Sequence, residues 1–380
     1  MKTLDPGCSL PRKSLIRGRG DKHMARALQL ARRGLCTTHP NPRVGCVIVK
    51  KGEVVGEGFH ARAGEPHAEI LALAQAGARA KGADVYLTLE PCCHQGRTGP
   101  CTQALKDAGV ARVIAAMEDP NPLVAGKGLV ALRASGIAAE AGLMEEEAAQ
   151  LNRGFVSRMT RKRPWVTLKL AMSLDGRTAM GSGESRWISG EEARADVHRL
   201  RAEAGAVLTS VETVLADDPE LTVRRVETSR QPDRIVLDTQ LRSPPTANVW
   251  KPGVRRIAIA VRPPSDRIEA LRRQGVEVAL AGTSADSRVE LASALATLGR
   301  MEINEVLVES GPKLAGALLQ ANLVDELVLY VAPGLLGDEA RALAHLPGLT
   351  RLDQRIKLRY TDSRLVGEDL RITAVPVIPA

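Results

Sequence analysis

Residues 67–117 have the sequence HAEILALAQAGARAKGADVYLTLEPCCHQGRTGPCTQALKDAGVARVIAAM, and this stretch decides the fold of the first part of the chain. A helical pattern, HAEILALAQAGA, precedes an extended one, ADVYLTLE, and the same order returns after a cysteine-bearing loop. Helices and strands that alternate at this length are typical of a sheet with helices on its faces. The stretch therefore predicts an α/β fold.

The flanking sequence continues this pattern in both directions. Residues 44–59 contain two β-branched runs around Lys51 and Gly52, which predict a hairpin. The segment from Glu145 to Pro164 begins acidic and ends basic, as expected of a connecting helix. Beyond Pro164, strands such as EVLVES and helices such as ELASALATLGR alternate again. The second part of the chain is therefore a second α/β domain.

The length of 380 residues fits two domains. We expect a basic N-terminal tail at 1–20, a first domain at 21–145, a helical connector at 146–163 and a second domain at 164–380.

The composition excludes several classes of protein. Apolar residues make up 44% and charged residues 26%, which is typical of a folded globular chain and excludes disorder. No apolar run reaches the ~18 residues of a membrane span, and no signal peptide is recognisable, so we expect a cytoplasmic protein without a membrane partner. Part of the net charge of +9 lies on the N-terminal tail and the remainder is spread thinly along the chain, and eight aromatic residues leave little to stack bases. We therefore expect a phosphorylated small molecule, and no nucleic acid, as the partner.

One set of residues has the composition of a catalytic zinc site. His67 opens a helix, Cys92 follows a strand and Cys101 begins the next helix. One imidazole and two thiolates with an open fourth position describe a catalytic site, and Glu69 matches the non-ligand glutamate of zinc deaminases. Cys93 and His94 are rival ligands, but Cys93 points to the opposite side if the strand continues. A structural zinc, or an ordinary histidine and a solvated glutamate, is the alternative interpretation.

The same residues predict a reaction. Zinc makes water a stronger acid, and Glu69 would move a proton from that water to a ring nitrogen and to departing ammonia. The expected reaction is hydrolytic deamination of an amino-substituted heterocycle. A nucleic-acid base deaminase would share the motif but would need stacking aromatics. A non-catalytic zinc-stabilised binding module would leave Glu69 without a role.

Longer strings carry a resemblance to a known family. They are HPNPRVGCVIV (39–49), GFH (58–60), LEPCCHQGRTGPC (89–101), EDPNPLVAGKG (118–128), KLAMSLDGRTA (169–179), SGESRWIS (182–189), TVLADDPELTVR (213–224) and VESGPKLAGALL (308–319). The chain resembles, over about residues 21–375, the bifunctional riboflavin-biosynthesis proteins that join diaminohydroxyphosphoribosylaminopyrimidine deaminase to 5-amino-6-(5-phosphoribosylamino)uracil reductase. Gly99 and Cys93 depart from the family pattern, where Pro and Ser are usual.

The resemblance implies a fold, an activity and cofactors for each domain. Residues 21–145 would be a zinc-dependent deaminase domain with a cytidine-deaminase-like three-layer α/β/α fold. Residues 164–380 would be an NADPH-dependent reductase domain with a dihydrofolate-reductase-like α/β fold. The two would act in turn on one phosphorylated pyrimidine, and we also expect a homo-oligomer.

The resemblance also implies roles for individual residues. In the first domain His67, Cys92 and Cys101 would hold zinc, with Glu69 as the proton shuttle. Asn41 and His60 would contact the base, and the ribose phosphate would meet His94, Arg97, Asp119 and Asn121. In the second domain NADPH would contact Ala171, Trp187, Thr213, Asp217, Thr239, Gly311, Pro312, Lys313, Leu314, Ala315, Gly316 and Ala317. The second substrate would contact Ser185, Arg201, Leu221, Arg224 and Glu309.

The residues alone support the reductase assignment only weakly. No G-x-G-x-x-G follows a strand, so the usual dinucleotide fingerprint is absent. The turn at Gly311 opens a helix whose amides could receive a phosphate, but most such junctions merely turn the chain. Without the resemblance, Trp187 would be a core residue and Asp217 a turn residue.

Overall fold

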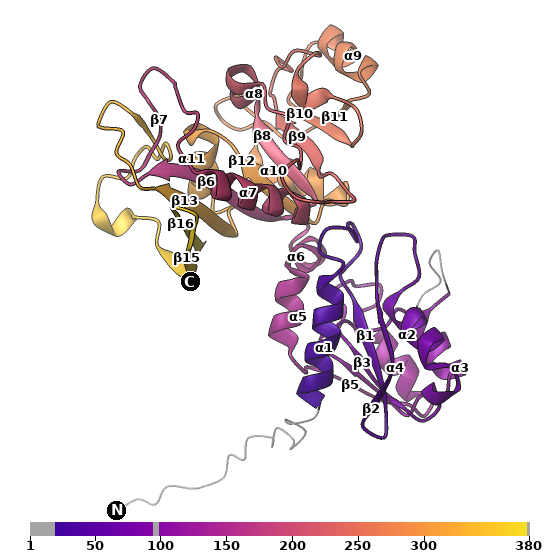
Figure 1. Cartoon of the computed structure of the whole chain (residues 1–380). Helices are drawn as coiled ribbons and strands as arrows, with labels where there is room; N and C mark the ends of the chain where they lie inside the picture. Colours follow the sequence, from indigo (N-terminus) through magenta and orange to yellow (C-terminus); the bar gives the residue numbers. More distant parts are fainter. Residues whose placement is uncertain (1–19, 94–98, 378–380) are drawn as a thin grey trace, which may run out of the picture. The chain divides into compact units, whose positions relative to one another are not determined.

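The computed structural model describes residues 20–93 and 99–377, which divide into two compact units (Figure 1). The first unit comprises the chain up to Gly34 together with Arg43–Leu151, and the second comprises Leu35–Pro42 and Asn152–Ala380. The segment Leu35–Pro42 belongs to the second unit because its backbone carbonyls accept hydrogen bonds there. Arg230 Nε donates to Cys36 at 3.1 Å, and Asn304 Nδ2 donates to Pro40 at 2.7 Å. The sequence pattern did not predict that Leu35–Pro42 groups with the second unit.

The first unit is built on a five-stranded sheet of order β2-β1-β3-β4-β5. β1 runs antiparallel to β2 and β3, whereas β3, β4 and β5 are parallel. The strands are β1 (Gly45–Lys50), β2 (Glu53–Phe59), β3 (Asp84–Leu87), β4 (Arg112–Ala115) and β5 (Ala138–Ala141). The predicted hairpin is confirmed, since positive φ angles of 50° at Lys51 and 86° at Gly52 make the turn that joins β1 to β2.

Helices cover both faces of this sheet and make three layers (Figure 1). The helices are α1 (Gly20–Arg32), α2 (Ala68–Ala76), α3 (Cys101–Asp107), α4 (Lys127–Arg133) and α5 (Glu145–Leu151), with a short 3₁₀ helix, η1 (Gly77–Ala80). α1 lies against Gly45, and α2 lies against Gly58 on the opposite face. Ile48, Ala72, Leu105 and Leu132 are fully buried in the core that α2, α3 and α4 share. The expected three-layer cytidine-deaminase-like architecture is confirmed.

The second unit has a nine-stranded sheet of order β11-β10-β9-β8-β12-β6-β13-β16-β15. Neighbouring strands from β11 to β13 are parallel, and β13, β16 and β15 are antiparallel. The strands of this sheet are β6 (Trp165–Ser173), β8 (Ala206–Ser210), β9 (Asp233–Leu237), β10 (Arg256–Ala260), β11 (Glu277–Leu280), β12 (Glu305–Glu309), β13 (Glu326–Ala332), β15 (Leu358–Val366) and β16 (Asp369–Pro376). A small separate sheet pairs β7 (Arg177–Ala179) with β14 (Arg341–Ala342).

Helices pack on the nine-stranded sheet and bury separate apolar clusters, one of which includes Leu168, Ile257 and Leu298 and another Val214, Trp250 and Leu271. The helices of this unit are α6 (Arg153–Arg161), α7 (Glu191–Glu203), α8 (Val211–Asp217), α9 (Ser265–Arg273), α10 (Leu291–Arg300) and α11 (Pro312–Gln320), with the 3₁₀ helix η2 (Asn248–Trp250). A further 3₁₀ helix, η3 (Leu352–Gln354), has no buried residue. The predicted alternation is confirmed as far as β13. The β15–β16 hairpin escaped the sequence analysis because β15 is solvent-exposed along most of its length and shows no apolar alternation.

None of the helices in the described ranges combines the length and the apolar character needed to cross a membrane.

Gly58 tests the close contact between α2 and the sheet. A Cβ added there would overlap the carbonyl oxygen of Ala68 and lie 2.8 Å from Ala72 N, so Gly58→Ala must push α2 outward. We expect destabilisation by about 1–3 kcal/mol, as for other overpacked sites, measured by hydrogen exchange of the β1 and β2 amides. Gly99→Ala is the matched control, since an added Cβ there meets no atom of the described residues within 4 Å. Equal exchange in both variants would contradict the close packing.

Candidate functional site

Three potential metal ligands converge at one edge of the first sheet. His67 is the N-cap residue of α2, Cys92 follows β3, and Cys101 is the first residue of α3. Their ligand atoms lie within 4.8 Å of one another, with His67 Nδ1 3.2 Å from Cys101 Sγ and 3.7 Å from Cys92 Sγ. The sequence analysis named the same three residues.

Backbone hydrogen bonds hold the two cysteines together across the loop between them. The amide of Cys101 donates to Cys92 Sγ at 3.3 Å, and the amide of Thr102 donates to the Cys92 carbonyl at 3.1 Å. These two hydrogen bonds attach the first turn of α3 to Cys92, in the segment that follows β3. The residues inserted between the cysteines, which lengthen this loop relative to the shorter C-x-x-C spacing, leave the two sulfurs adjacent.

The electrostatics of the three side chains suit a cation. A hydrogen bond from the Cys101 thiol lowers the pKa of Cys92 to about 4, and the same bond raises the pKa of Cys101. The hydrogen bond to Cys92 raises the pKa of His67. The two sulfurs thus share one proton next to an imidazole, and a metal can replace that proton. Two thiols and one imidazole are a donor set that fits zinc and leaves a fourth position open.

Glu69 lies in the first turn of α2, two residues after His67, and only 4% of its surface is exposed. Burial is the main cause that raises the pKa of its carboxyl group. A carboxyl group with a raised pKa beside a metal site is suited to accept a proton and return it.

The other residues predicted for this site are placed as follows. His60 is buried, its ring centre lies 5.4 Å from that of His67, and its Nδ1 is 3.2 Å from the Pro66 carbonyl oxygen. Asp119 and Asn121 lie in the segment that follows β4. Asn41 belongs to the segment grouped with the second unit. His94 and Arg97 lie outside the described residues.

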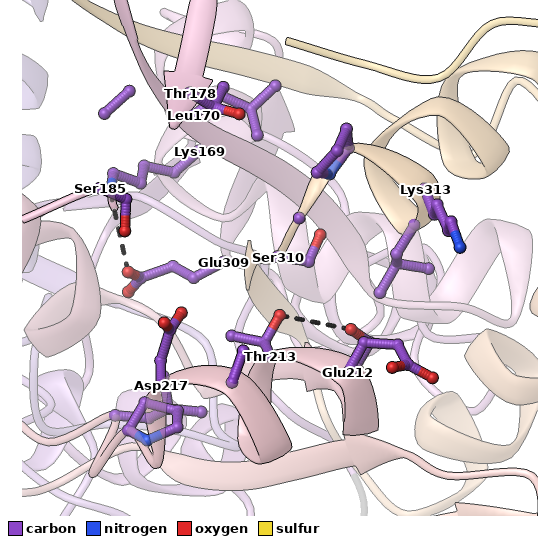
Figure 2. A pocket seen from close by; sticks show the side chains of 18 of the residues that line it. Lys169, Leu170, Thr178, Ser185, Glu212, Thr213, Asp217, Glu309, Ser310 and Lys313 are labelled. Atoms are coloured by element: carbon purple, nitrogen blue, oxygen red, sulfur yellow. Dashed lines mark hydrogen bonds and ion pairs between the residues drawn. The ribbon is translucent and has the colours of Figure 1, made fainter. Parts of the chain in front are cut away.

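The second unit contains a cavity of about 2040 Å³ (Figure 2). This volume is about twice the upper range for a single small-molecule pocket, so the cavity has room for a cofactor and a substrate together. Fifteen of the seventeen residues predicted for this domain line it, namely Ala171, Ser185, Trp187, Arg201, Thr213, Asp217, Leu221, Arg224, Thr239, Glu309, Gly311, Pro312, Lys313, Leu314 and Ala317.

Ala315 and Gly316 do not line the cavity. Ala315 is fully buried, and a Cβ on Gly316 would overlap the backbone of His345. Both residues therefore lie on the side of α11 that faces the protein interior, as the helical period requires for residues between Leu314 and Ala317.

Buried charges define one wall of the cavity. The Arg201 guanidinium donates two hydrogen bonds to the Glu309 carboxylate, at 2.5 and 3.0 Å, and Lys169 Nζ lies 3.8 Å from Glu309. Figure 2 shows Lys169 and Glu309 pointing toward one another. Burial alone would raise the pKa of Glu309, but the two cations lower it to about 2, and burial lowers the pKa of Lys169. Glu309 is therefore a fixed anion.

The residues that follow Glu309 in the cavity lining have features that fit a phosphate-bearing cofactor. Gly311 is the N-cap of α11, and open space surrounds the position of its missing side chain. Next to it, the Ser310 hydroxyl oxygen is buried without a hydrogen-bond partner among the described residues (Figure 2). Trp187 is 70% exposed and lies under the guanidinium of Arg194, so it is not the core residue that its type alone would indicate.

The polar residues of this cavity that sequence reasoning missed include Lys169, His198 and Ser310. His198 is 6% exposed, and its Nδ1 accepts the Arg224 amide at 2.9 Å, so its proton resides on Nε2. A lysine inside the apolar strand KLAMS was the one available signal, because a strand that is otherwise buried seldom carries a charge without a partner.

Comparisons with known proteins agree with a metal-binding cluster in the first unit and a separate cavity in the second. Residues 19–117 match the model of the cytidine and deoxycytidylate deaminase zinc-binding region, and residues 164–372 match that of the RibD C-terminal domain. The protein is therefore a zinc-binding deaminase joined to a reductase.

Whole-chain relatives identify the family. Riboflavin biosynthesis protein RibD of Escherichia coli (strain K12) is 52% identical over 361 residues, which cover 92% of this chain and 97% of that protein. RibD of Aquifex aeolicus (strain VF5) is 42% identical over 358 residues, covering 94% and 99%. The chain belongs to the RibD family and is a bifunctional enzyme of riboflavin biosynthesis, which confirms the resemblance noted in its sequence.

Solved structures agree as well. Acinetobacter baumannii RibD superposes with a TM-score of 0.87 at 43% identity, covering 94% of this chain and 99% of that one. The diaminohydroxyphosphoribosylaminopyrimidine deaminase/5-amino-6-(5-phosphoribosylamino)uracil reductase of Thermotoga maritima superposes with a TM-score of 0.82 at 32% identity, with the same coverage.

Cys101→Ala tests the metal site. Removal of one of three ligands should deplete zinc from the purified protein, because two remaining donors hold the ion poorly. Metal analysis of the variant beside the wild-type chain measures the loss, and Cys46→Ala, a buried cysteine outside the cluster, is the control. Full zinc occupancy in Cys101→Ala would show that another residue, such as Cys93 or His94, is the ligand.

His198 should make the stability of the second unit depend on pH. Burial and then the charges of Arg201 and Arg224 lower its pKa from 6.5 to about 4, so the unfolded chain binds the proton more readily. The stabilisation by neutral His198 is complete above pH 6.5 and is lost as the pH falls toward 4, by about 3 kcal/mol in total.

Urea unfolding of the second unit at pH 7 and pH 4.5 measures this loss. His198→Gln should show a smaller loss of stability than the wild type, whereas His345→Gln, at an exposed position, should behave like the wild type. An unchanged pH dependence in His198→Gln would exclude His198 as the cause.

Proposed function

We propose that residues 21–145 deaminate 2,5-diamino-6-(5-phosphoribosylamino)pyrimidin-4(3H)-one, and that residues 164–380 then reduce the ribosyl chain of 5-amino-6-(5-phosphoribosylamino)uracil to ribityl with NADPH. One observation carries the first step most directly. Two thiols and an imidazole lie within 4.8 Å of one another beside a buried glutamate, in a chain 52% identical to a RibD. The similarity to the Thermotoga maritima deaminase/reductase, which is named for both activities, supports this choice of substrates.

In the first step His67, Cys92 and Cys101 would hold zinc, which when bound supplies Lewis acidity toward water. Glu69 accepts a proton from the attacking water, whose oxygen adds to C2 of the pyrimidinone ring. Glu69 delivers this proton to the ring nitrogen, then takes the second proton from the hydroxyl group now on C2 and gives it to the amino group, so that the C2–N bond breaks, a carbonyl forms and ammonia leaves. Its burial excludes bulk water from this transfer. Asn41, His60, His94, Arg97, Asp119 and Asn121 would hold the base and the ribose phosphate.

In the second step NADPH, when bound, supplies a hydride to the opened sugar. The cavity wall around Gly311 and Ser310 would receive the cofactor phosphates, since a helix N-terminus and a hydroxyl without a partner both favour an anion. Glu309 and Arg201 would orient the sugar hydroxyls, because their mutual hydrogen bonds fix both groups. Ser185 and Arg224 would bind the substrate phosphate.

A small phosphorylated pyrimidine, and not nucleic acid, is the substrate that we propose, because the chain matches RibD over both of its domains. The homo-oligomeric state and the cytoplasmic location remain predictions.

Incubation of the protein with the diamino ribotide tests the function. We expect ammonia release without NADPH and a further mass gain of two hydrogens when NADPH is added. Glu69→Gln should retain zinc but release ammonia ~10²-fold or more slowly, since it removes general acid–base transfer. The same variant should still oxidise NADPH when supplied with the deaminated ribotide.

Glu309→Ala provides the converse variant, in which the deaminated intermediate should accumulate. A nearly unimpaired Glu69→Gln enzyme would refute the deamination mechanism. Failure of folded Glu69→Gln to reduce the deaminated ribotide would refute the assignment of the two activities to separate domains.

A further inference from the structure

The carboxylate of Glu90 lies two residues before the proposed zinc ligand Cys92 and has a role that the mechanism above does not use. Only 3% of Glu90 is exposed. Its two oxygens accept backbone hydrogen bonds from the amides of Asp119 at 3.0 Å, Gly126 at 2.8 Å, Gly128 at 2.8 Å and Leu129 at 3.1 Å. One buried side chain thus binds both ends of the segment 119–129.

The packing around this carboxylate is close. A Cβ added to Gly128 would overlap the Pro91 carbonyl oxygen and lie 3.0 Å from Glu90 Oε1. The start of α4 therefore rests directly on the Glu90–Pro91 backbone. Negative charge is favourable at this helix start, since the first amides of a helix have no partner within it.

The segment 119–129 depends on such an external acceptor. Two side-chain oxygens accept hydrogen bonds within the segment and form local turns. The Asn121 amide donates to Asp119 Oδ1 at 2.8 Å, and the Leu123 amide donates to Asn121 Oδ1 at 3.1 Å. These turns shape the segment locally but do not connect it to the sheet. Glu90 makes that connection.

On its other side, Glu90 is fixed to the metal-binding end of the sheet. Its amide donates to the Met117 carbonyl at 3.0 Å, and the neighbouring Cys92 is tied to Cys101 and Thr102 by the hydrogen bonds described above. A short rigid connection, Glu90–Pro91–Cys92, therefore relates the position of Asp119 and Asn121 to that of the zinc ligands.

We propose that Glu90 is a positioning residue for the deamination, which holds the segment 119–129 at the distance from the metal site where Asp119 and Asn121 meet the ribose phosphate. The proposal rests on the proposed function of the first domain. In this proposal Glu90 acts through the hydrogen bonds that it accepts from backbone amides, and not by contact with the substrate or the metal.

Glu90→Gln tests the proposal. The variant keeps the shape of the side chain but turns one acceptor oxygen into an NH₂ group that faces backbone N–H donors. We expect the KM for the diamino ribotide to rise tenfold or more, with kcat changed less than threefold and one zinc retained per chain. Glu118→Gln is the matched control, because Glu118 is an exposed carboxylate immediately before the segment 119–129, and the KM of this variant should stay within twofold of the wild type.

A second ligand separates positioning from general damage to the site. The free base 2,5,6-triaminopyrimidin-4-one lacks the ribose phosphate, so its Ki as a competitor should be the same, within twofold, in Glu90→Gln and the wild type. A ribotide KM within twofold of the wild type, or equal weakening of base and ribotide, would overturn the proposal. Absence of ammonia release by the wild type would instead refute the proposed function.

Gly128→Ala keeps the proposal testable if Glu90→Gln does not fold. This variant retains the carboxylate but pushes the start of α4 away from it. We expect the same rise in KM for the ribotide and the same Ki for the base. NADPH oxidation with the deaminated ribotide should be unchanged in both variants, and an unchanged ribotide KM in Gly128→Ala would overturn the proposal.

Discussion

Parallel pairing of strands is the constraint on which both sites depend. In a parallel sheet the carboxyl ends of neighbouring strands meet at one edge, so the residues that follow those strands are brought together. In the first unit this edge assembles the segments after β3 and β4, which carry Cys92 and Asp119. In the second unit it assembles the ends of β8, β9 and β12, next to Thr213, Thr239 and Ser310.

The two units use buried charge in different ways at this edge. In the first unit Glu69 is buried with a raised pKa, which suits a group that exchanges protons. In the second unit Glu309 is equally buried, but Arg201 and Lys169 hold it as an anion. A buried ion pair costs desolvation energy and contributes little net stability, so its value here is a fixed orientation. The surrounding charges thus decide whether the pKa of a buried carboxyl group is raised or lowered.

Much of the fold and of the zinc site could be predicted because local signals sufficed. The Lys51–Gly52 turn, the alternation of helices and strands, and the order of His67, Glu69, Cys92 and Cys101 are all properties of short segments. The residues that line the cavity of the second unit were predictable only through the family resemblance, since a glycine turn before a helix, as at Gly311, does not by itself indicate a binding site. The β15–β16 hairpin was missed because its exposed strand lacks the apolar period that marks most strands.

The sequence by itself determined which residue types are available for the proposed chemistry, namely a histidine, two cysteines and a glutamate in a fixed order, and it determined the two α/β patterns, because residue type and local period are properties of short segments. Only the tertiary structure decided which distant groups meet. The ring of amides around Glu90, the place of Lys169 beside Glu309, and the association of Leu35–Pro42 with the second unit each join segments far apart along the chain. Such contacts depend on the order of the strands in the sheet and on how closely the backbones of different elements pack. A local pattern of residues encodes neither the strand order nor the packing distance.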